Sequence, residues 1–152
     1  MYDYNEKVGE KLNELLEKNY DAEKGYKKAA ENAQTNSLKN FFNRKAQERY
    51  NFGHEIKGEL QRFGEDPDKG GSLTGKAHRT WMDVKSFFSA DNDESMLEAA
   101  ITGEKASLDE YEDVLSDSEP HIPESTASLL RNHYNKIRTD VTTIKRLEDL
   151  ID

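Results

Sequence analysis

The chain has 152 residues, a length typical of one domain, with 34% hydrophobic and 35% charged residues. It has no cysteine, which excludes disulfide frameworks, thiolate zinc sites and cysteine nucleophiles. The net charge of −9 disfavours non-specific binding to nucleic acid or anionic lipid, and neither a signal peptide nor an apolar run of roughly 18 residues is found. We therefore expect a cytoplasmic protein with no nucleic-acid partner and no membrane span.

The first half of the chain contains two long amphipathic patterns. Apolar residues recur at spacings of three and four over residues 4–32 and again over residues 37–63, which predicts two helices. Ser37 ends the polar break between them and is suited to cap the second helix. A shorter helix is expected over residues 73–88, where Trp81 supplies a large apolar anchor for docking on the bundle.

The second half contains two further long patterns. A helix is predicted over residues 93–115, with Asp93 as its N-cap, and another over residues 123–151, with Pro123 in its first turn. The predicted apolar stripe of this last helix comprises Leu129, Leu130, Tyr134, Ile137, Val141, Ile144, Leu147 and Ile151.

These elements predict an all-α protein, because no run of residues alternates as a strand does. Helices joined by short breaks run antiparallel, so the first long helix pairs with the second and the third with the last. Residues 64–91 are too many for a hairpin and predict a long, partly helical crossover. The expected architecture is a ferritin-like four-helix bundle with one long crossover, forming a single domain over residues 1–152.

Three glutamates are candidate metal ligands in such a bundle: Glu23, Glu48 and Glu104. Ferritin-like di-metal proteins place a glutamate on each of two helices and a Glu-x-x-His pair on each of the other two. Glu23 and Glu104 fall on apolar stripes, where a carboxylate is costly to bury unless it is paired, protonated or bound to metal. A reduced site for iron, manganese or another divalent cation is one interpretation. Carboxylates that hydrogen-bond to Tyr, Asn or Arg at a hydrated seam are the other.

The di-metal motif is incomplete, because Glu-x-x-His occurs nowhere in the chain. Asn51 stands three residues after Glu48, where a histidine is required. Leu130 stands three residues before His133, where a glutamate is required. A full oxidase site is therefore disfavoured, and no catalytic or cofactor-binding residue is predicted. If Glu23 and Glu104 are buried without metal, replacing either with Gln or Leu should leave stability unchanged or raise it.

Several segments resemble a bacterial family of ferritin-like four-helix-bundle proteins of unknown function. The resemblance covers about residues 7–147, and its most specific piece is a Gly-Ser-x-x-Gly turn followed by His78-Arg79-Thr80-Trp81. Other matching pieces are Leu12-Asn13-Glu14-Leu15-Leu16, Glu23-Lys24-Gly25-Tyr26 and Gly103-Glu104 followed by Tyr111. The resemblance implies a ferritin-like fold, a bacterial source and a role in general or envelope stress. It implies no catalytic residue.

The leading hypothesis is a non-catalytic or weakly metal-binding bacterial stress protein, which acts alone or as a homodimer. Two alternatives stay open. The first is a carboxylate-bridged iron or manganese oxidase, or an iron-handling protein, with a non-standard ligand set. The second is a helical interaction module that binds a partner helix.

Overall fold

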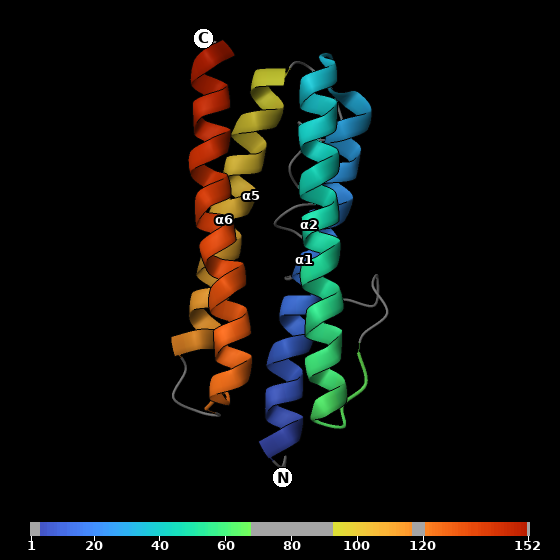
Figure 1. Cartoon of the computed structure of the whole chain (residues 1–152), viewed down its shortest axis with the longest axis vertical. Helices are drawn as coiled ribbons and strands as arrows, with labels where there is room; N and C mark the ends of the chain where they lie inside the picture. Colours follow the sequence, from blue (N-terminus) through green and yellow to red (C-terminus); the bar gives the residue numbers. More distant parts are fainter. Residues whose placement is uncertain (1–3, 68–92, 117–120, 152) are drawn as a thin grey trace.

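The computed structural model describes residues 4–67, 93–116 and 121–151, and over these ranges it contains helices and no strand (Figure 1). The helices are α1 (Tyr4–Asn32), α2 (Asn36–Arg62), α5 (Asp93–Ser116) and α6 (Glu124–Ile151). The four predicted long helices are therefore confirmed, with boundaries within one residue of expectation. The predicted helix over residues 73–88 and its anchor Trp81 lie outside the described residues.

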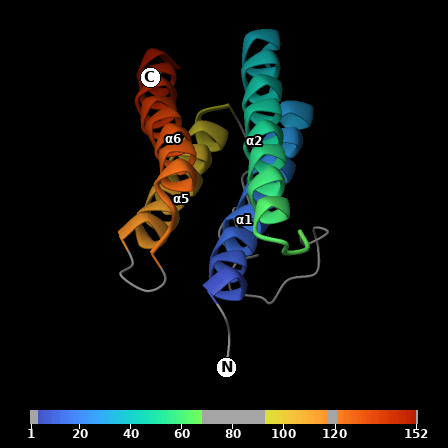
Figure 2. The same ribbon diagram turned by 60° about the horizontal axis from the view of Figure 1, so that its bottom comes forward.

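The helices form two antiparallel hairpins, α1 with α2 and α5 with α6, and α5 also packs against α1. This confirms the predicted pairing. Figure 1 shows α1 and α6 running in one direction and α2 and α5 in the other, and Figure 2 shows the two hairpins side by side. The end of α2 and the start of α5 therefore lie at opposite ends of the bundle. None of the four described helices has an apolar stretch long enough to cross a lipid bilayer.

Two polar side chains fix the ends of helices near the α1–α2 turn. Thr35, rather than the predicted Ser37, is the N-cap of α2, and its hydroxyl accepts a hydrogen bond from the backbone N–H of Leu38 at 3.4 Å. Asp93, at the start of α5, accepts a hydrogen bond on Oδ1 from the backbone N–H of Gln34 at 2.8 Å. The first hairpin is thereby tied to the first residue of the second hairpin.

The apolar core consists of two clusters, each containing residues from all four described helices. The first cluster comprises Ala22, Tyr26, Ala29, Ala30, Ala33, Leu38, Phe41, Phe42, Ala46, Met96, Leu97, Ala99, Ala100 and Ile144. The second comprises Val8, Leu12, Leu15, Leu16, Phe52, Ile56, Leu60, Tyr111, Val114, Leu130 and Ile137.

Polar and charged side chains lie where the two clusters meet, and we call them the polar layer. The polar layer comprises Asn19, Lys45, Glu48, Arg49, Glu104, Tyr111, His133 and Asp140. It includes at least one residue from each described helix. Six of its members are buried, and Lys45 and Glu48 are half-buried at its edge, so the layer interrupts the apolar core at about half its height.

The last helix shows why the predicted stripe was partly wrong. Leu130, Ile137 and Ile144 are buried as expected, but His133 and Asp140 occupy the core positions between them. The predicted stripe members Leu129, Tyr134 and Val141 are only half-buried. The prediction admitted apolar residues alone, and this rotated the inferred stripe away from the polar residues that face the interior.

Candidate functional site in the interior of the bundle

The three predicted metal ligands lie in different surroundings. Glu104 is fully buried, whereas Glu23 and Glu48 are half-buried. Glu23 forms an ion pair with Lys27 (Oε2–Nζ 2.8 Å) and lines a groove over α1 and α2. Glu48 lines a separate groove between α2 and α6, and its charge interacts with those of Glu104 and Asp140. The structure thus brings Glu48 and Glu104 toward each other and places Glu23 in a different groove.

Glu104 is paired with an arginine that the sequence analysis did not identify. Arg49 is 1% exposed, and its Nη2 donates to Glu104 Oε1 across the interface between α2 and α5. Burial raises the pKa of Glu104, and the Arg49 charge opposes this rise. A neutral Glu104 would leave the buried guanidinium without an anion, so we treat the pair as ionised. The pairing reverses the expectation that Glu104 can be neutralised at no cost.

A chain of hydrogen bonds continues from Arg49 across the bundle. Arg49 Nη1 donates to Asn19 Oδ1 at 2.7 Å, and Asn19 Nδ2 donates to the Tyr111 hydroxyl at 2.9 Å. Burial raises the pKa of Tyr111, so its hydroxyl keeps its proton and donates to His133 Nδ1 at 2.9 Å. His133 Nε2 then donates to Glu55 Oε1 at 2.8 Å. Each residue after Arg49 accepts from the one before it, which assigns the His133 proton to Nε2.

The surroundings of His133 favour its neutral form. Its ring stacks on Phe52, with the centroids 4.1 Å apart, and is 1% exposed. Burial lowers the pKa of His133 to about 4, even though the hydrogen bond and charge of Glu55 act in the opposite direction. Arg49 and Lys136 lower it further. His133 is therefore a neutral member of the hydrogen-bond chain at physiological pH.

A second group of charges lies between α2 and α6. Lys45 Nζ donates to Asp140 Oδ1 at 2.7 Å and to Glu48 Oε2 at 3.4 Å. Burial raises the pKa of Glu48 to about 8, hydrogen bonding and charge from Asp140 add to the rise, and Lys45 opposes it. At neutral pH Glu48 therefore holds a proton and hydrogen-bonds to Asp140. This proton compensates for the excess of carboxylates over cations in the layer.

Among the buried carboxylate oxygens that lack a hydrogen bond of ordinary geometry from any described residue, three belong to the polar layer: Glu48 Oε1, Glu104 Oε2 and Asp140 Oδ2. A proton on Glu48 satisfies the first and the third, because it is shared between the two carboxyl groups. Buried polar atoms without partners are uncommon in folded proteins and point to strain, a bound ion or a functional role.

The polar layer does not fit a metal ion as its side chains now lie. In the described ranges, no group of three or more His, Asp or Glu side chains is arranged to hold a metal. Arg49 binds Glu104, and Lys45 binds Glu48 and Asp140, so side-chain cations already contact the carboxylates. A metal would require both the carboxylates and these cations to move.

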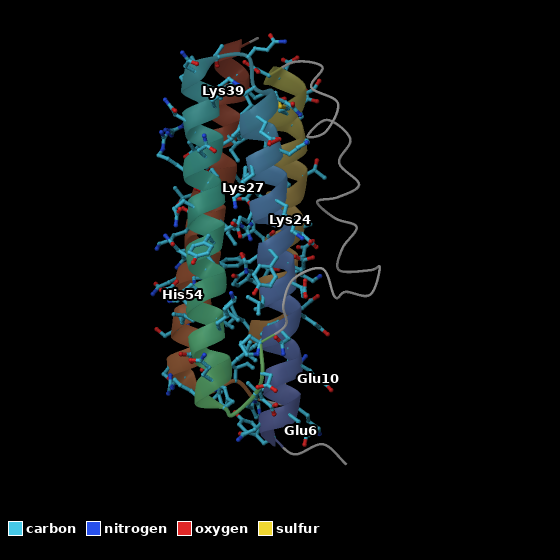
Figure 3. The ribbon with its side chains drawn as sticks, turned by 90° about the vertical axis from the view of Figure 1, so that its right-hand side faces the viewer. Glu6, Glu10, Lys24, Lys27, Lys39 and His54 are labelled. Carbon is cyan, nitrogen blue, oxygen red and sulfur yellow. The ribbon has the colours of Figure 1, made fainter. Side chains whose placement is uncertain are left out.

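The two charge networks reach the surface in one groove between α2 and α6, with a volume of about 560 Å³. Glu48 and Glu55 both line it, and Arg44 and Lys136 add positive charge. His54 also lines the groove, stacked on Tyr50, and Figure 3 shows it on the outer side of α2.

Asn19, Lys45, Arg49 and Asp140 are the residues of the polar layer that the sequence analysis missed. Each lies three or four residues from the neighbouring core residues of its own helix, as Arg49 does from Ala46 and Phe52. A charged residue in phase with an apolar stripe was therefore the available signal. The same signal identified Glu104, but it was applied to carboxylates and not to their cationic or amide partners.

The family described as Domain of unknown function (DUF2383) matches residues 7–117 of the chain. This span covers nearly all of α1, together with α2 and α5, and ends before α6. Comparisons with curated proteins and with solved structures gave no match. The chemistry of the polar layer is therefore the main indication of function.

Proposed function

Because the chain belongs to the DUF2383 family of domains of unknown function, we propose its role from its interior: a ferritin-like bacterial stress protein that is non-catalytic and binds metal only weakly. The helix directions support the ferritin-like part of this proposal, since α2 and α5 run the same way and require a long crossover. The position of the polar layer supports it too, because ferritin-like metal proteins carry their ligands on the inward faces of the four helices.

One observation supports the proposal that the protein is non-catalytic. Arg49 and Lys45 donate hydrogen bonds to the carboxylates that a metal would need. A buried carboxylate with a close cationic partner has its charge neutralised, so little electrostatic attraction is left for a metal ion. A di-metal oxidase needs several free oxygen ligands and two imidazoles around its metals. The only buried histidine of the described residues, His133, uses both ring nitrogens in hydrogen bonds.

The test is metal content followed by Fe(II) oxidation. Protein purified without chelator is assayed by mass spectrometry, then mixed with Fe(II) in air while oxygen uptake and Fe(III) absorbance are recorded. We expect less than one metal per chain and oxidation no faster than in buffer. Stoichiometric iron, together with rapid oxidation that Glu104→Ala abolishes, would overturn the proposal.

The stress role rests on the family resemblance and needs a test in cells. A strain of the source bacterium that lacks the gene is compared with its parent after heat, oxidative and envelope stress. Lower survival under at least one stress is expected, with recovery when the gene is restored. Equal survival under all three contradicts this part of the proposal.

The carboxylate-bridged oxidase is a second candidate, because Glu104 Oε2 is buried and lies outside the hydrogen bond from Arg49. A buried carboxylate oxygen of this kind is what an absent cation would leave behind. The iron assay described above separates this candidate from the first. The helical interaction module and the homodimer stay predictions. Light scattering on the purified chain measures its mass and so tests whether it forms a homodimer.

A further inference from the structure

The outer side of α2 differs in composition from the outer side of α1. From Glu6 onward, every exposed residue of α1 is a glutamate or a lysine, and four of them are labelled in Figure 3. Eight exposed residues of α2, which we call the α2 stripe, include no Asp, Glu, Lys or Arg: Asn40, Asn43, Gln47, Tyr50, Asn51, His54, Gly58 and Gln61. They recur at spacings of three and four, so they lie on one side of the helix. In a chain with 35% charged residues, such a side indicates a surface that contacts another molecule.

The shape of this side suits a second helix. Tyr50, in the middle of the stripe, is 50% exposed, and its ring stacks on that of His54 with the centroids 6.4 Å apart. A groove borders the stripe on each side, one of about 560 Å³ between α2 and α6 and one of about 430 Å³ over α1 and α2. Tyrosine is enriched in protein interfaces, and helices pack by fitting ridges of side chains into such grooves.

Gly58 gives an independent indication on the same side of α2. It is an exposed residue inside the helix, and a Cβ atom added there would meet no described atom within 4 Å. Glycine inside a helix costs about 1 kcal/mol relative to alanine. Nothing in the described parts of the chain requires this cost. A backbone from outside, however, can approach closely where no side chain stands.

The charges of the helices indicate that a second copy of the chain fits this surface. Two copies, each with a net charge of −9, repel one another at long range. The helix α5 has eight acidic side chains and one basic side chain, so a contact between two α5 helices would bring like charges together. The helix α2 has six basic and three acidic side chains, and none of them belongs to the stripe. Two acidic copies can therefore meet along the α2 stripe without opposing like charges.

We propose that two copies of this chain associate through the α2 stripe as an antiparallel dimer, whose twofold axis passes between Tyr50 and Asn51. A twofold contact is self-complementary, so each pair of facing residues occurs twice. This axis brings the other stripe residues level with one another in pairs: Asn40 with Gln61, Asn43 with Gly58, and Gln47 with His54. At the edge of the stripe, Arg44 lies nearly level with Glu55 of the second copy, which has the opposite charge. The dimer goes beyond the proposed function and does not depend on metal binding or on a stress role.

Gly58→Arg tests this interface, because it should break the dimer without weakening the helix. The mass of the protein is measured by sedimentation equilibrium up to about 1 mM, where wild type should be a dimer. Gly58→Arg should raise the dimer dissociation constant at least about tenfold. Because Arg favours a helix over Gly, the unfolding midpoint of the dilute, monomeric protein should not fall. Thr102→Arg is the control, since it adds the same side chain at an exposed position of α5 and should dimerise like wild type.

Cross-linking tests the antiparallel arrangement, and because the chain has no cysteine, one introduced cysteine reports on one position. Asn51→Cys and Asn40→Cys replace the same residue type at two exposed positions of α2. Asn51 lies beside the twofold axis, so Asn51→Cys should form disulfide-linked dimers under mild oxidation. The two copies of Asn40 would lie roughly 30 Å apart, too far for a disulfide. Asn40→Cys should therefore link only to Gln61→Cys, in a mixture of the two variants.

Each failure has a defined meaning. Wild type that is monomeric at about 1 mM overturns the proposal, as does a dimer that Gly58→Arg leaves intact, because its interface then lies elsewhere. Asn40→Cys chains that link to one another as readily as Asn51→Cys chains overturn the antiparallel arrangement, and so does a dimer in which Asn51→Cys does not link. The iron assay is a separate measurement, so the dimer and the proposed function can each fail without the other.

Discussion

The protonation of His133 gives the most direct test of the polar layer, because it should change the free energy of unfolding. The pKa of His133 falls from 6.5 to about 4 in the folded chain, mainly because the ring is buried. A group with a lowered native pKa stabilises the fold above its unfolded pKa, because the unfolded chain binds the proton more readily. Stability is therefore fully present above about pH 6.5 and is lost as the pH falls toward 4.

The size of the effect follows from the shift. One pKa unit corresponds to about 1.4 kcal/mol, so the full contribution is about 3 kcal/mol. Between pH 7.5 and pH 5.5 the part that is lost is about 1.4 kcal/mol, a tenfold change in the unfolding constant. Glu48 acts in the opposite direction, because its pKa is raised to about 8 and its contribution weakens as the pH rises. A comparison with a variant that lacks the His133 ring isolates the histidine.

The assay is urea unfolding of wild type and His133→Gln at pH 7.5 and pH 5.5, followed by circular dichroism. The stability advantage of wild type over His133→Gln should shrink by about 1.4 kcal/mol at the lower pH. His54→Gln is the matched control, since it removes an exposed imidazole from the same groove as Glu55, the partner of His133. An advantage that stays constant between the two pH values would refute the assignment of His133 as a buried, neutral member of the chain.

Two further predictions concern the same layer. Arg49→Met or Glu104→Leu alone should lower the free energy of unfolding by about 3–5 kcal/mol, because each leaves a buried charge without its partner. The double variant should lose less than either single variant, and a loss equal to the sum of the two would contradict a buried ion pair. Tyr111→Phe should cost about 1–3 kcal/mol in thermal unfolding, because Asn19 Nδ2 loses an acceptor and His133 Nδ1 loses its donor. An unchanged midpoint would show that this chain contributes nothing to stability.

The helices could be predicted from the sequence because each needs only a local pattern. The stripe over residues 4–32 has the period of a helix, and the bounds of α1 agree with it. Glu104 could be singled out in the same way, as a carboxylate in phase with apolar neighbours. Its burial followed from the same pattern.

The partner of Glu104 could not be predicted, because it depends on the alignment of α2 against α5. No local pattern states which residue of α2 lies level with Glu104. Arg49 and Asn51 are both polar, yet one is enclosed and the other is exposed and bonds to Gln47. Only the packed bundle shows that Arg49, and not Asn51, contacts Glu104.

The division of the apolar core by the polar layer also determines how the helices align along their lengths. Coiled helices with uniformly apolar seams can slide by one heptad, about 10.5 Å, with little change in buried apolar area. Such a slide of α6 along α2 would carry Asp140 away from Lys45 and His133 away from Glu55, and would break both hydrogen bonds. Charges that reduce the apolar area of the core thus exclude the shifted alignments that an all-leucine interior would tolerate.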